Sequence, residues 1–385
     1  MALERSPLGG RFWWWLTVAS LSRAPVLMSA VAFTSVAALI AEDPDQGGVL
    51  AGASVMGMLF GTPIAISVQR RWPPRRLLTV QLIACASCWL AFVFTVAAKA
   101  EMVVLVPVAL VAGATMAGTA GLVRSMMSDA VSESNQARAS TIDALAQDAV
   151  IFLAPVAVSV GVTAGAVGAP VAVAVVALLA VISVPVLKPR SRTLEKQREL
   201  TTPAPARPVG KWVSWSFLSL GVGLALGAVE AGAVGLAVGL GLSVGSAWLF
   251  FFILAGSGAI GAWLDISAMQ QRWPGKRLLI LLTSLIIGCV LLSFGPTWLT
   301  AMIGLVLIGL PTAAVLGLRS HVFDDDAPAS RSGGLTLAFA AQSIGFAVGA
   351  TLLAITGQSW ALLIATGVLI ASGLLIRGMR RQDKQ

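Results

Sequence analysis

Four ionisable side chains stand within or at the end of long apolar runs, and they are the residues best placed to do chemistry. Arg23, Asp148 and Glu230 lie inside such runs, and Asp265 ends another. If the runs cross a bilayer, each buried charge costs about 3 kcal/mol even by the lower estimates, and such residues usually serve a function. Their types suit proton transfer, ion pairing or the binding of a charged substrate.

The composition supports a membrane setting for these residues. The chain of 385 residues is 57% hydrophobic and 11% charged, with a mean hydropathy of +0.89. Soluble domains carry roughly 25% charged residues, so lipid must act as the solvent for most of this chain. It has one His and no Tyr. So few acid–base and nucleophilic side chains argue against an enzyme, and we expect neither a metal nor a cofactor.

The apolar runs predict an all-α polytopic membrane protein with twelve transmembrane helices, since a span needs about 20 apolar residues. A polar stretch divides them into an N-terminal six-helix bundle (1–187), a cytoplasmic basic linker (188–211) and a C-terminal six-helix bundle (212–385). The expected spans are 12–40, 49–68, 77–98, 102–123, 140–162, 169–187, 212–236, 246–265, 278–294, 298–318, 333–355 and 360–376.

A repeated phrase indicates that the two bundles are copies of one unit. Arg-Trp-Pro-Pro-Arg-Arg-Leu-Leu at 71–78 returns as Arg-Trp-Pro-Gly-Lys-Arg-Leu-Leu at 272–279. Arg124 and Gln147 recur as Arg319 and Gln342 at a common spacing. Two halves in the same orientation are parallel repeats, which secondary transporters use to build a central site.

The basic residues predict the orientation. With the N-terminus inside, all Lys and Arg residues except Arg23 and Lys99 fall in segments on the cytoplasmic side. This asymmetry places both termini in the cytoplasm of a multi-pass protein of the cell membrane. It also accounts for the net charge of +9, so nucleic acid is not an expected partner.

At this point the chain resembles the major facilitator superfamily. The resemblance covers twelve spans, the central linker and the basic loops after spans two and eight. The family's loop motif, Gly-x-x-x-Asp followed by basic residues, is matched by Gly261 and Asp265 with Arg272 and Arg277. The first half keeps Gly61, but Ala65 stands where the acid should be.

Short strings also resemble a group of actinobacterial exporters. They are Ser-Arg-Ala-Pro at 22–25, Gln-Asp at 147–148 and Gly-Ala-Val-Glu at 227–230. This similarity implies export of small molecules without naming one.

The superfamily fold implies roles for the intramembrane charges. The first and fifth spans of a half are neighbours there, so Arg23 and Asp148, which match in depth, are predicted to pair. The pair is either structural or part of proton or substrate handling. The seventh span lines the cavity, where desolvation of Glu230 would favour its protonated form and suit a proton antiporter. The alternative is a protonated or backbone-bonded carboxyl that is merely tolerated.

Other polar residues are assigned to gating and binding. Asp265 is expected at the inner gate facing a helix N-terminus of the other half, with Arg138 as its partner. Arg272 and Arg277 join this gate, whereas Asp143 is expected to be mainly structural. The amides Gln147 and Gln342 either hydrogen-bond between helices or bind substrate.

The prediction is therefore a secondary transporter that exports small amphipathic molecules in exchange for protons, acting as a monomer. Few amides and no Tyr argue against sugar as the substrate. One alternative is transport of an organic anion held by Arg23. Outside transport, the alternatives are a sensor or scaffold that kept the fold and a membrane-embedded enzyme.

Overall fold

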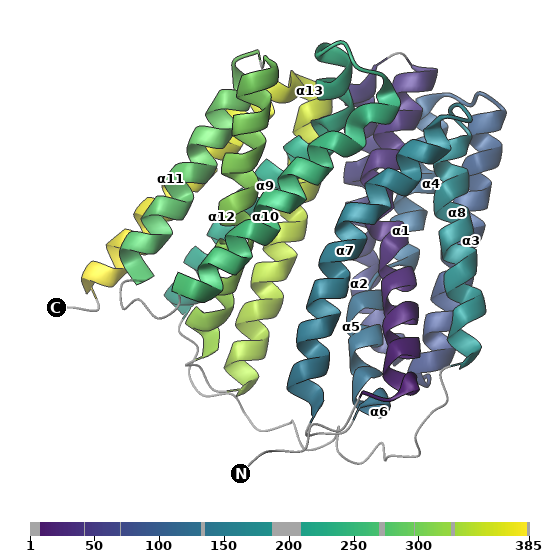
Figure 1. Ribbon diagram of the computed structural model, residues 1–385, viewed down its shortest axis with the longest axis horizontal. Helices are drawn as coiled ribbons and strands as arrows, with labels where there is room; N and C mark the ends of the chain where they lie inside the picture. Colours follow the sequence, from purple (N-terminus) through teal and green to yellow (C-terminus); the bar gives the residue numbers. More distant parts are fainter. Residues whose placement is uncertain are drawn as a thin grey trace.

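The computed structural model describes residues 8–41, 43–69, 71–131, 135–186, 209–268, 274–295, 297–324 and 328–382. All regular elements in these ranges are helices, and they form two groups that stand side by side (Figure 1). The group before residue 187 contains α1 (Gly10–Ile40), η1 (Pro44–Gln46), α2 (Gly47–Gln69), α3 (Pro74–Ala97), α4 (Met102–Thr115), α5 (Thr119–Ser125), α6 (Met127–Ala130), α7 (Gln136–Val162), α8 (Gly168–Ser183) and η3 (Val184–Val186).

The second group begins at residue 209. It contains α9 (Val209–Gly239), η5 (Val244–Ala247), α10 (Trp248–Ala268), α11 (Pro274–Ser293), α12 (Trp298–Asp324) and α13 (Pro328–Gln382). In the described ranges, eight helical stretches are long and apolar enough to cross a membrane, and three shorter apolar helices accompany them. Exposed Leu, Ile, Val, Phe and Trp side chains on many helices fit a lipid-facing surface.

Two glycines explain where the helix bounds depart from the expected spans. The expected span 102–123 is broken between α4 and α5, where Gly118 has φ +74°. The expected spans 333–355 and 360–376 both lie in α13, which Gly357 interrupts with a non-helical backbone (φ 78°, ψ 167°). Glycine populates positive φ without steric cost, so the chain can turn at these positions.

The repeated basic phrase marks helix starts. α3 begins at Pro74 and α11 at Pro274, because proline has no N–H to lose in the first turn. α1 begins and α13 ends at the lower side of Figure 1, which we call the terminal end. η1 and η5 lie at the other side, which we call the opposite end.

The described contacts between the two groups include close backbone contacts at the opposite end. A Cβ added to Gly48, at the start of α2, would collide with the carbonyl oxygen of Ala350 in α13. A Cβ added to Gly235 of α9 would lie 3.3 Å from Oδ1 of Asp45 in η1. Small residues permit this approach, and the groups therefore meet closely at the opposite end.

Candidate functional site

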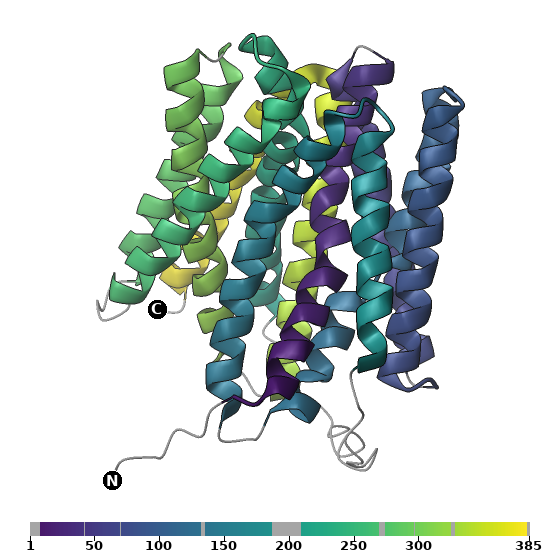
Figure 2. The same ribbon diagram turned by 45° about the vertical axis from the view of Figure 1, so that its right-hand side comes forward.

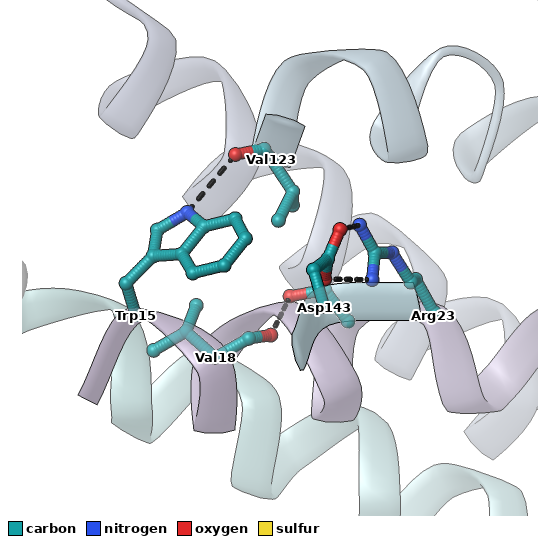
Figure 3. Close-up of polar contacts among 6 residues, drawn as sticks. Trp15, Val18, Arg23, Val123 and Asp143 are labelled. Atoms are coloured by element: carbon teal, nitrogen blue, oxygen red, sulfur yellow. Dashed lines mark hydrogen bonds and ion pairs between the residues drawn. The ribbon is translucent and has the colours of Figure 1, made fainter. Parts of the chain in front are cut away.

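Arg23 of α1 forms a buried, two-pronged ion pair with Asp143 of α7 (Figure 3). Its Nη1 donates to Oδ1 at 2.6 Å, and its Nη2 donates to Oδ2 at 3.0 Å. The side chains are 9% and 8% exposed, respectively, so water screens this pair little. The Arg23 Nε has no hydrogen-bond partner among the described residues. The fork geometry fixes α1 against α7 at this level.

This contact corrects the expectation that Arg23 pairs with Asp148. The two aspartates are five residues apart on α7, a rotation of about 140°, so they face different directions. α1 and α7 both begin at the terminal end and run side by side (Figure 2). Helical side chains lean toward the helix N-terminus, so the long Arg23 side chain reaches back toward the terminal end and meets Asp143. The side chain of Asp148 lies outside the described residues.

A hydrogen bond from Trp15 supports the same end of α1. Its indole Nε1 donates to the carbonyl oxygen of Val123 in α5 at 3.1 Å (Figure 3). Trp15 is almost fully buried, so this bond satisfies a donor that burial would otherwise leave unpaired. α1 is therefore held by α5 and by α7 within a few turns of its start.

Glu230 lies on α9 in the second group and is partly buried. Among the described residues, no ion pair or hydrogen bond satisfies its carboxylate. Alanine and valine precede and follow it on α9, at Ala228, Val229 and Ala231. Glu230 falls within Trp212–Gly239, one of the helical stretches that are long and apolar enough to cross a membrane.

A second buried arginine, Arg319, was not expected. The sequence placed it in a cytoplasmic loop, because the apolar run ends at residue 318. The structure instead continues α12 to Asp324 and leaves Arg319 only 2% exposed. Its Nη1 donates to Gln342 Oε1 on α13 at 2.9 Å and to Ser219 Oγ on α9 at 3.1 Å. Gln342 was expected either to hydrogen-bond between helices or to bind substrate, and here it accepts a hydrogen bond from a neighbouring helix.

The residues of the first group that correspond to Arg319 and Gln342 in the repeat are exposed. Arg124, the counterpart of Arg319, is exposed on α5. Gln147, the counterpart of Gln342, is exposed on α7. A guanidinium therefore links helices in each group, but in the first it comes from α1 and in the second from α12.

The expected inner gate is described only in part. The side chains of Asp265 and Arg138 and the whole of Arg272 lie outside the described residues. Arg277 is partly buried near the start of α11. The gate thus stays a prediction.

An acid in η1, ahead of the expected span 49–68, sits at the contact between the groups. Asp45 is partly buried, and its Oδ1 lies near Gly235 of α9. Burial and, to a lesser extent, the neighbouring Asp43 carboxylate raise the pKa of Asp45 above its ordinary value.

Comparison with known proteins agrees with this architecture. Residues 16–350 match the family model described as Major Facilitator Superfamily. The chain belongs to this superfamily and is a membrane transporter rather than an enzyme. No curated protein sequence matches the chain closely enough to count as a relative.

Solved structures share the fold at low sequence identity. A point mutant of the nucleoside transporter NupG superposes with a TM-score of 0.78 at 11% identity, covering 96% of this chain and 100% of that one. A bacterial homologue of the human lysosomal transporter Spinster, in an inward-facing and occupied conformation, has a TM-score of 0.73 at 14% identity, covering 96% of each chain. A D-xylose–proton symporter has a TM-score of 0.70 at 14% identity, covering 94% of this chain and 95% of that one.

Proposed function

We propose that this chain is a proton-coupled exporter of small amphipathic molecules in the cell membrane, working by alternating access. Membership of the superfamily supports transport. The single observation that carries proton coupling is Glu230, a partly buried carboxyl on α9 with no partner among the described residues. Because no cation among the described residues holds it ionised, it can take up a proton from one side and release it to the other.

The proposed architecture is twelve crossings in two six-span repeats, residues 1–187 and 212–385, joined by a cytoplasmic linker at 188–211. α4 and α5 together would make one crossing, and Gly357 would divide α13 into two. Both termini would be cytoplasmic, in keeping with the basic residues of the terminal end. Contacts at the opposite end would then close the outer side, and breaking them would open the carrier outward.

In this proposal the Arg23–Asp143 pair positions α1 and α7. Both terminal nitrogens of Arg23 are engaged by one carboxylate, so the pair is neutral as a whole. The alternative, an organic-anion transporter with Arg23 as its anchor, requires the substrate to displace Asp143. A membrane sensor or scaffold without transport is the alternative outside this class.

Proton movement in proteoliposomes tests the proposal. The purified protein is reconstituted with a pH-sensitive dye inside and an imposed pH gradient, and ethidium is added as an amphipathic probe. The proposal predicts that the wild-type protein dissipates the gradient on addition of the probe and that Glu230→Gln does not. Glu101→Gln removes an exposed carboxyl at the start of α4 and is the matched control. Equal proton movement by Glu230→Gln and the wild type would remove Glu230 from the mechanism.

A further inference from the structure

Arg319 is a buried cation whose described partners are all neutral. It is 2% exposed, and its hydrogen bonds go to a serine hydroxyl and an amide oxygen. The ring of Phe339 lies over the guanidinium at 4.2 Å, which stabilises a cation but does not neutralise it. Within the part of the chain that the structure describes, Arg319 therefore lacks the carboxylate that Arg23 has.

One edge of the Arg319 guanidinium, Nε and Nη2, makes no hydrogen bond to a described residue and can bind a carboxylate. Nη1 donates both of the hydrogen bonds that Arg319 makes to described residues. Nε is buried and has no hydrogen-bond partner among the described residues. Neither of the two hydrogen bonds to described residues comes from Nη2. Arginine keeps its proton in proteins, so it must find a counter-charge, and its planar fork binds carboxylates through two parallel hydrogen bonds. A buried charge left without a counter-ion is costly.

Polar side chains from three helices meet at Arg319. α12 packs mainly against α10 and α11, and the Arg319 side chain reaches from it to Ser219 on α9 and Gln342 on α13. Ser219 and Gln342 orient the guanidinium through Nη1 and make no hydrogen bond with Nε or Nη2. The cluster lies toward the terminal end, where α9 and α13 begin and α12 ends.

We propose that Arg319, oriented by Ser219 and Gln342, is a binding site for the carboxylate of a small organic anion. The inference deepens the proposed transport function and rests on it for the role of the anion as cargo. The apolar bundle favours an anion with an apolar body, such as an aromatic or short aliphatic carboxylate. Arg319 replaces Arg23 as the anchor, because Arg23 already holds an internal carboxylate.

Binding of radiolabelled benzoate by equilibrium dialysis tests the site. The full-length protein is placed in nanodiscs of phosphatidylcholine, so that no anionic lipid headgroup competes. The wild type is expected to bind benzoate, with octanoate competing and ethidium not competing. Arg319→Gln should weaken binding at least about tenfold, because a charge-assisted hydrogen-bond pair is lost. Arg124→Gln removes its exposed repeat counterpart and should bind as the wild type does.

Gln342→Glu separates a binding role from a structural one. It is nearly isosteric and supplies an internal carboxylate, which reproduces the Arg23–Asp143 arrangement. We expect it to abolish benzoate binding and to raise the melting temperature. This variant carries the test even if Arg319→Gln fails to fold.

Three results would overturn the site: no binding of benzoate or octanoate by the wild type, unchanged binding by Arg319→Gln, or unchanged binding by Gln342→Glu. The outcome is separable from that of the transport proposal, since dialysis needs no proton gradient. Arg319-dependent benzoate binding without proton movement would refute the proton coupling alone. Ethidium-driven proton movement without benzoate binding would refute the anion site alone.

Discussion

Neutralising Asp143 should destabilise the protein far more than neutralising Asp143 and Arg23 together. Asp143→Asn removes both charge-assisted hydrogen bonds, at 2.6 and 3.0 Å, and leaves a guanidinium that is 9% exposed. Removing one member of a buried pair costs about 3–5 kcal/mol, because the remaining charge stays buried without compensation. The double variant Arg23→Gln/Asp143→Asn buries two amides that can bond to each other, and it should cost about 1–2 kcal/mol.

The two single variants should also differ from each other. Arg23→Gln leaves a carboxyl, which can take up a proton and become neutral. Asp143→Asn leaves a guanidinium, which cannot lose its proton. Arg23→Gln is therefore expected to cost less than Asp143→Asn, although both should cost more than the double variant.

Thermal unfolding of the purified protein in detergent measures these differences. At roughly 2–4 °C for each kcal/mol in a domain the size of one bundle, Asp143→Asn should lower the melting temperature by roughly 10 °C. The double variant should lose only a few degrees. The reasoning is refuted if the single effects simply add, with a coupling below about 0.5 kcal/mol. Retained transport by a stable double variant would confine the pair to a structural role.

Three further predictions concern proton coupling and the opposite end. Glu230→Gln should still exchange a transported probe in counterflow without a pH gradient. Movement of the probe should no longer be accompanied by movement of protons. Gly48→Leu should force α2 away from Ala350 on α13 and raise the reactivity of an Ala350→Cys reporter toward an impermeant maleimide. Gly121→Leu, where an added Cβ meets no atom within 4 Å, should leave the reporter unchanged. Asp45→Asn should raise stability at neutral pH and leave it nearly unchanged in acid, as melting temperatures at the two pH values will show.

The sign of the Asp45 effect follows from its raised pKa. A folded state that holds the proton more tightly than the unfolded state gains stability from this group at low pH. That contribution is lost as the pH rises through the raised value, and asparagine avoids the loss. A variant that is destabilised at neutral pH would contradict this account.

The other two predictions have equally definite contrary outcomes. Coupled transport by Glu230→Gln would assign the proton to another group. An Ala350→Cys reporter that stays unreactive in Gly48→Leu would show that the α2–α13 contact tolerates a side chain.

The apolar runs predicted the positions of the helices because a span has a length fixed by the bilayer. The run 12–40 corresponds to α1, Gly10–Ile40, and the run 102–123 to α4 and α5 together. Hydropathy does not predict how each helix is rotated about its own axis. Depth alone matched Arg23 with Asp148, whereas helix rotation and the lean of the side chain select Asp143.

Arg319 shows a second limit of the same kind. Hydropathy ends the span at residue 318, so the next arginine looked like a loop residue of the cytoplasmic face. Only the neighbouring helices reveal that α12 continues and that Ser219 and Gln342 enclose the guanidinium. The repeat of Arg124 and Gln147 as Arg319 and Gln342 was the available signal, because it placed an arginine and an amide at matching positions in each half.

The central claim is that a carboxyl on α9 couples protons to the movement of a small molecule. The most direct test follows internal pH in proteoliposomes that carry a pH gradient, while ethidium and benzoate are added in turn to the wild type, Glu230→Gln and Glu101→Gln. The account predicts that at least one probe dissipates the gradient in the wild type and Glu101→Gln, and that neither does in Glu230→Gln. Proton movement that persists in Glu230→Gln, or that neither probe elicits from the wild type, would contradict it.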